Sequence, residues 1–182
     1  MAAFETAAAA DPHDPHSRYL GAFTLLHLGR YADAADRYRQ VEELAPGWYH
    51  CRAEAWLADQ LACGRLDHED LQALTLLGDG PVAPKTKLSL ADKLLSRRPD
   101  LPVGHLQRAE VLAGLNRKDE SRKALETGLL GDPETDVRTR LLVQLATLTE
   151  DPTRRASIYR EANAVDGNLV AAATAAVALR NE

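Results

Sequence analysis

Apolar residues recur three and four positions apart along most of the chain, in runs of roughly 11 to 16 residues. This spacing is the period of an amphipathic α-helix. The alternation of apolar and polar residues that is typical of β-strands does not occur in the sequence. Short breaks that contain Gly, Pro, Asn or Asp separate the runs. The pattern therefore predicts an all-α protein.

The breaks set the expected bounds of the helices. Gly29 and Gly64 end two of them, and Pro46 closes another, because glycine suits the left-handed end of a helix and proline cannot continue one. Asn116 suits the same left-handed conformation. The predicted helices cover residues 15–28, 32–44, 48–63, 67–77, 85–98, 102–115, 119–130, 135–148, 151–165 and 167 onward.

The breaks also recur at a fixed distance. Pro133 follows Pro99 by 34 residues, and Gly167 follows Pro133 by 34 more. Pro46 and Pro99 are 53 residues apart, which leaves 19 residues beyond one such period, and we place this insertion at residues 66–84. A pair of helices cannot cover its own apolar face, so pairs that repeat at one period are expected to stack on one another.

The first pair carries a recognisable motif. Residues 27–48, HLGRYADAADRYRQVEELAPGW, resemble the turn and second helix of a tetratricopeptide repeat, a family whose period is also 34 residues. Two later pairs retain parts of the pattern, although the first helices lack the Trp and Leu-Gly pair of the family. The matching positions are Gly29, Tyr31, Ala34, Tyr38 and Pro46, then Ala109, Leu125 and Gly128, and finally Tyr159, Ala162 and Gly167.

The resemblance implies an all-α, right-handed superhelical stack of antiparallel helical hairpins. Residues 1–14 are expected to form a flexible or partly helical leader, and residues 15–182 a single repeat domain. An Ala-rich helix at residues 168–182 would cap the last open face. The expected hairpins are 15–46, 47–99 with the insertion 66–84, 100–133 and 134–167.

Composition and charge disfavour some classes of binding partner and cellular location. The chain has 22 Lys and Arg against 27 Asp and Glu, a net charge of −5. That balance disfavours binding to nucleic acid or to an anionic membrane, both of which need a basic surface. Two cysteines cannot form a disulfide framework, no apolar run is long enough to span a bilayer, and the first residues do not resemble a secretory signal. We therefore expect a cytoplasmic protein.

Chemical motifs give no sign of catalysis. The sequence has no Cys-x-x-Cys pair, nucleophile elbow, phosphate loop or dinucleotide fingerprint. The nearest metal candidate joins Cys63 to His68, Glu69 and Asp70, but its spacing does not match a zinc site. We therefore expect no metal, no cofactor and no enzymatic activity.

In the family that the chain resembles, the first helix of each hairpin lines a concave groove that takes a peptide. Tyr19 and Phe23 could serve as anchors in this groove, or they could pack under the leader or against the second helix. Arg140 could pair with one acidic group, although a surface arginine is more often solvated. Mapped by helix phase, the candidate groove consists of His16, Tyr19, Leu20, Phe23, His27, Glu54, Ala58, Leu106, Gln107, Glu110, Arg140 and Gln144.

The resulting functional hypothesis is a non-catalytic scaffold that binds a partner protein or peptide in the concave groove. Two alternatives remain open at this point. The chain could be a structural module that forms a homodimer within a larger assembly, through the Ala-rich last helix or residues 66–84. Alternatively, the insertion could close a small-ligand or enzymatic pocket around His27, Glu54 and Arg140.

Overall fold

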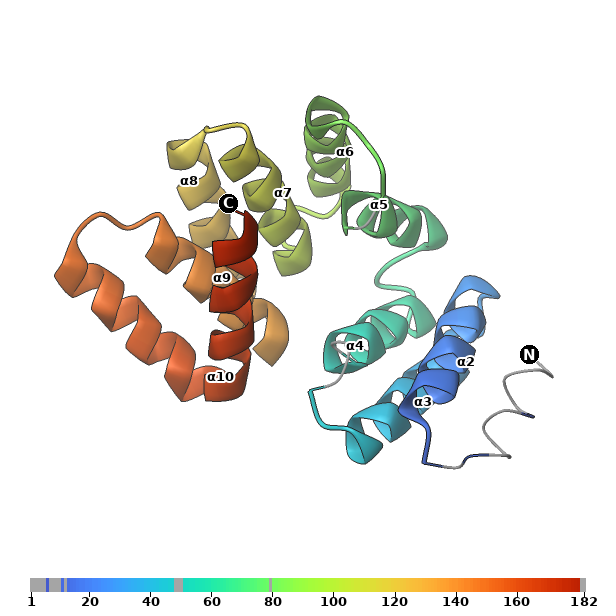
Figure 1. Cartoon of the computed structure of the whole chain (residues 1–182). Helices are drawn as coiled ribbons and strands as arrows, with labels where there is room; N and C mark the ends of the chain where they lie inside the picture. The colour runs from blue at the N-terminus through green and yellow to red at the C-terminus, as the bar shows by residue number, and fades with distance from the viewer. Residues whose placement is uncertain (1–5, 7–10, 12, 48–50, 79, 181–182) are drawn as a thin grey trace. The chain divides into compact units, whose positions relative to one another are not determined.

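The structure is a computed structural model that describes residues 6, 11, 13–47, 51–78 and 80–180, with side chains for all of these except 169 and 172–180. Every regular element within these ranges is an α-helix, which confirms the predicted fold class (Figure 1). Most of the predicted leader lies outside the described residues. So do the predicted helix start at Trp48 and the last two residues of the chain.

The chain forms two compact units, residues 1–69 and residues 70–182. The first unit contains α2 (Pro15–His27), α3 (Tyr31–Leu44) and α4 (Cys51–Ala62). Helix α2 packs against α3, and α3 packs against α4, so consecutive helices form the contacts of this unit. Each of these helices follows a predicted apolar run to within a few residues.

The second unit has the same sequential packing. Helix α6 packs against α7, and α7 pairs with α8 before α9 pairs with α10. These two pairs cover residues 102–130 and 135–180, and the hairpin bounds expected at 100–133 and 134–167 stay a prediction. The helices that make up most of this unit are α5 (His68–Gly78), α6 (Pro84–Arg97), α7 (Pro102–Gly114), α8 (Lys118–Leu130), α9 (Thr135–Thr147) and α10 (Pro152–Arg180).

Helix α10 is interrupted close to the predicted break at Gly167. Asp166 has φ −161° and ψ 104°, outside the helical region, so two helical stretches meet there across a kink. The Asp166 carboxylate accepts a hydrogen bond from the Asn168 backbone N–H at 3.0 Å, which is how an N-cap residue starts a helix. Val170, just beyond the kink, is buried in the core of the second unit.

The tight turns within the hairpins use left-handed residues, as the sequence predicts. Gly29 has φ +76° and Asn116 has φ +59°. In the first turn the Arg30 N–H donates to the Leu25 carbonyl at 2.9 Å, and the turn after Asn116 has an equivalent bond of the same length. These bonds satisfy carbonyls that the helix end would otherwise leave open.

The residues that carry the repeat motif lie in the helix contacts. Ala34, Tyr38, Ala109, Leu125 and Ala162 are all buried. Gly128 is needed for close approach, because a Cβ added there would come within 3.0 Å of His105 Cβ and 3.1 Å of a Leu141 methyl carbon. The small and large positions of the motif therefore set how closely the helices pack.

The predicted insertion at residues 66–84 contains α5, which confirms the short helix expected there. Buried Asp70 joins α5 to the end of α6, because its carboxylate accepts from Arg98 Nε at 3.0 Å and lies 3.5 Å from Arg97. Lys87 of α6 donates to the carbonyls of Leu77 and Gly78, both at 2.9 Å, at the other end of α5. The predicted hairpin 47–99 has its helices in both units, so its pairing stays a prediction.

Among the helices that the structure describes, none has both the length and the apolar character that crossing a bilayer requires.

Candidate functional site

Helices α7 and α9 are the first helices of successive hairpins, and they contact each other within the second unit. Three of the predicted groove residues meet where they pass: Glu110 on α7, and Arg140 and Gln144 one turn apart on α9. All three are half-buried. We call these three residues the α7–α9 face.

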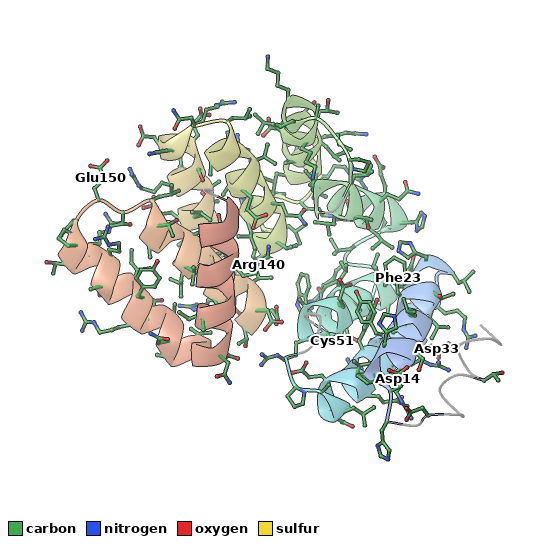
Figure 2. The ribbon with its side chains drawn as sticks, viewed as in Figure 1. Asp14, Phe23, Asp33, Cys51, Arg140 and Glu150 are labelled. Atoms are coloured by element: carbon green, nitrogen blue, oxygen red, sulfur yellow. The ribbon has the colours of Figure 1, made fainter. Side chains whose placement is uncertain are left out.

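Glu110 is the centre of the α7–α9 face. Its Oε1 accepts from Arg140 Nη2 at 3.0 Å and from Gln144 Nε2 at 2.8 Å. The side chain of Glu110 is 17% exposed, whereas that of Arg140, labelled in Figure 2, is 36% exposed. An ionised carboxylate only accepts hydrogen bonds, so the Gln144 amide must turn its NH₂ toward Glu110 and its oxygen away. The formal charges of Glu110 and Arg140 therefore cancel, and the Arg140 side chain remains partly accessible to water.

Two predicted groove residues of α7 are engaged elsewhere. Leu106 is fully buried in the core of the second unit, which corrects the expectation that it lines an open surface. Gln107 turns toward α5, where its Nε2 donates to the Leu74 carbonyl at 3.4 Å. Its Oε1 is buried and has no hydrogen-bond partner among the residues that the structure describes. Gln107 therefore joins α7 to α5, and neither residue is part of the α7–α9 face.

In the first unit, the aromatic residues of α2 divide between core and surface. The Tyr19 ring packs edge-on against Tyr38 of α3, with centroids 5.6 Å apart, as in the alternative that placed Tyr19 against the second helix. Phe23, labelled in Figure 2, is 42% exposed, and its centroid lies 4.4 Å from that of the His27 ring. Phe23 and His27 therefore leave an aromatic pair at the surface of the first unit.

The other predicted residues of the first unit differ in exposure. His16 is exposed at the start of α2, where Asp14 caps the helix by accepting from its backbone N–H at 3.1 Å. Leu20 and Glu54 are half-buried, whereas Ala58 is fully buried. As with Leu106, burial corrects the expectation that Ala58 lines a surface, because a small residue at this position serves helix contact instead.

The ligand pocket proposed around His27, Glu54 and Arg140 would draw on both units. His27 and Glu54 belong to residues 1–69, and Arg140 belongs to residues 70–182. This pocket stays a prediction, as does self-association. For the latter, Leu76 on α5 is 43% exposed within the predicted insertion.

Sequence reasoning missed a hollow on the other side of α7, among α6, α7 and α8. It has a volume of about 430 Å³. Two ion pairs involve its lining residues: Arg108 Nε lies 2.7 Å from Asp92, and Glu120 pairs with Arg117 at 2.6 Å. Helical spacing alone could not have predicted it, because the hollow depends on how α6 sits against the hairpin of α7 and α8. Its lining residues are Asp92, Leu95, His105, Arg108, Glu120, Lys123, Ala124 and Thr127.

No group of three or more His, Cys, Asp or Glu side chains suited to a metal ion occurs in the described part of the chain. In the candidate around Cys63, Asp70 is bonded to Arg98, as described above. The Cys63 thiol, just after α4, lies 3.4 Å from the Gln60 carbonyl of that helix. Cys63 and Asp70 of this candidate therefore have other partners.

The chain is similar to several solved protein structures. No protein-family model matches the sequence, and no curated protein matches it. The crystal structure of TTC0263, described as a thermophilic TPR protein of Thermus thermophilus, is 24% identical with a TM-score of 0.45, over 96% of this chain and 87% of that one.

Two further solved structures match a similar share of the chain. YrrB, described as a TPR protein with an unusual peptide-binding site, is 16% identical with a TM-score of 0.46, over 94% of this chain and 97% of that one. MamA from Desulfovibrio magneticus RS-1 is 14% identical with a TM-score of 0.42, over 91% of this chain and 82% of that one. Structural matches to TPR proteins thus extend over most of the chain, while the hairpin architecture itself follows from the helix packing described above.

Proposed function

We propose that the chain is a non-catalytic module that binds a peptide or protein partner, and that the α7–α9 face is part of its binding surface. The observation that carries this proposal is the set of hydrogen-bond donors that the partly exposed Arg140 side chain has available. One of its N–H groups donates to Glu110, and its others have no acceptor among the described residues, although the side chain is 36% exposed. A guanidinium that is held in place with donors to spare is suited to a ligand.

The rigidity of the α7–α9 face favours recognition. Glu110 fixes both Arg140 and Gln144, and all three stand on packed helices rather than on loops. A partner would therefore lose little side-chain entropy in ordering these groups, which is a principal cost of association. Considered by itself, the first unit has the exposed Phe23, a surface aromatic of the kind that contributes strongly to protein interfaces.

The test begins with peptides selected from a random display library against the full-length chain, whose affinities are then measured by titration calorimetry. Arg140→Ala combined with Gln144→Ala is expected to weaken binding at least about tenfold, because a hydrogen bond to a charged group contributes roughly 1.5–3 kcal/mol. Peptides that bind this double variant as tightly as the unmodified chain would contradict the proposed surface. Failure to select any peptide would contradict the proposed function.

A matched control comes from the same helix. Arg138 lies two residues before Arg140, has a similar exposure of 38%, and pairs with Glu161 of α10 at 2.9 Å. Arg138→Ala removes the same side chain from a different side of α9. We expect this variant to bind the selected peptides with unchanged affinity, so that a loss in the double variant reports the α7–α9 face rather than the stability of the helix.

A further inference from the structure

We infer that the α7–α9 face selects a neutral carboxamide, an Asn or Gln side chain of an extended peptide, over a carboxylate. This inference rests on the proposed function and specifies the partner chemistry of the same site. It depends on the hydrogen-bonding groups that Arg140 and Gln144 leave available once both have bonded to Glu110.

The charge balance of the α7–α9 face disfavours a carboxylate ligand. Arg140 alone would attract a carboxylate, but Glu110 already neutralises it at 3.0 Å. An incoming carboxylate would meet attraction from Arg140 and repulsion from Glu110 at comparable distances, so its Coulomb gain would be small. It would still lose its own hydration in a half-buried setting, which is costly for an ion. A neutral group avoids most of that cost.

The hydrogen-bond donors and acceptors that remain on Arg140 and Gln144 match those of a carboxamide. Arg140 keeps N–H groups without an acceptor in the described part of the chain, and Gln144 keeps its side-chain oxygen, because its NH₂ is committed to Glu110. A carboxamide carries one carbonyl oxygen for the Arg140 donors and one NH₂ for the Gln144 oxygen. A carboxylate carries acceptors only, and it would face the Gln144 oxygen without a donor to offer.

The ends of the Arg140 and Gln144 side chains lie close together. Arg140 Nη2 and Gln144 Nε2 bond to the same Glu110 oxygen, at 3.0 and 2.8 Å. The ends of both side chains therefore lie beside the same carboxylate. The groups left for a ligand, the other Arg140 N–H groups and Gln144 Oε1, belong to these same two planar ends. We expect one amide side chain to reach an Arg140 N–H with its oxygen and Gln144 Oε1 with its NH₂.

The test uses peptides selected against the full-length chain, with their affinities measured by calorimetry. Double-mutant cycles with Gln144→Ala identify the peptide position that couples to the α7–α9 face. We expect Asn or Gln at that position, and we expect its replacement by Asp or Glu to weaken binding about tenfold. A coupled position that prefers the acidic residue in the unmodified chain would overturn the inference, even though it would leave the proposed function intact.

A specificity switch makes the test sharper. Glu110→Gln removes the neutralising charge and keeps a side-chain oxygen for Arg140 and Gln144. In this variant, the acidic peptide is expected to bind at least as tightly as the amide peptide, reversing the preference. An unchanged preference for the amide would show that Glu110 does not set the selectivity and would contradict the inference. Arg138→Gln, which alters a cation on another side of α9, should preserve the original preference.

Discussion

The hydroxyl of Tyr38 is a buried polar group of the first unit. The Tyr38 side chain, on α3, is fully buried, and its oxygen has no hydrogen-bond partner in the described part of the chain. Burial, with smaller contributions from Glu54, Tyr19 and Cys51, raises the pKa of Tyr38 far above its usual value. A buried hydroxyl without a partner costs free energy, so the aromatic ring rather than the oxygen stabilises this position.

This raised pKa predicts a dependence of stability on pH. In the unfolded chain Tyr38 loses its proton near pH 10, whereas in the folded protein it stays neutral at higher pH. The stability associated with the neutral form is therefore complete below about pH 10, and above it is lost by up to about 1.4 kcal/mol per pH unit. Urea denaturation at pH 9 and pH 11 should show a smaller loss of unfolding free energy in Tyr38→Phe than in the unmodified chain.

The control for this measurement is Tyr159→Phe, which removes a hydroxyl from a ring that is only half-buried. It should leave the alkaline loss of stability close to that of the unmodified chain. If Tyr38→Phe and Tyr159→Phe lose stability equally between the two pH values, the buried state of Tyr38 described here is contradicted.

At the scale of elements, polar contacts join α5 to α6. Asp70 in the first turn of α5 is fully buried and reaches Arg97 and Arg98, which end α6 or follow it directly. Near the other end of α5, Lys87 binds two backbone carbonyls that the helix leaves open. Charged contacts at both ends therefore hold an inserted helix that the repeat pattern itself does not specify.

The contribution of Asp70 can be compared with that of an exposed ion pair in the same unit. Asp70→Ala leaves two half-buried arginines without this carboxylate, and we expect it to lower the unfolding free energy by about 1–3 kcal/mol. Asp92→Ala removes a carboxylate that is 52% exposed beside Arg108, so its effect should stay below about 1 kcal/mol. Denaturant titration measures both, and faster hydrogen exchange in α5 should accompany the first. Equal effects would contradict a structural role for the buried carboxylate.

Helical periodicity and chain breaks were sufficient to predict most helices, because each run needs only local information. Gly29 and Asn116 could be read as left-handed turn residues for the same reason. The burial of Leu106 and the contact of Gln107 with α5 could not be predicted in this way. Both residues lie on the predicted inner side of α7, and their contacts depend on how α5 and α9 pack against that helix. The Glu110 cluster was predicted as three separate groove residues, but its shared oxygen depends on the crossing of two helices.

At the scale of the whole molecule, charge is unevenly distributed. Residues 1–69 contain 6 Lys and Arg against 11 Asp and Glu, whereas residues 70–182 contain 16 of each kind. The net charge of −5 therefore belongs to the first unit. The second unit, which carries the α7–α9 face, has no net charge to steer a charged partner toward it. This neutrality agrees with the local balance of Glu110 and Arg140.

The central claim is that the α7–α9 face contacts the partner, and side-chain NMR of the full-length chain tests it most directly. When a selected peptide is added to saturation, the Nε–H resonance of Arg140 and the side-chain NH₂ resonances of Gln144 are expected to shift, while the Nε–H resonance of Arg138 on the same helix stays in place. Binding that shifts Arg138 and leaves Arg140 and Gln144 unchanged would contradict the claim.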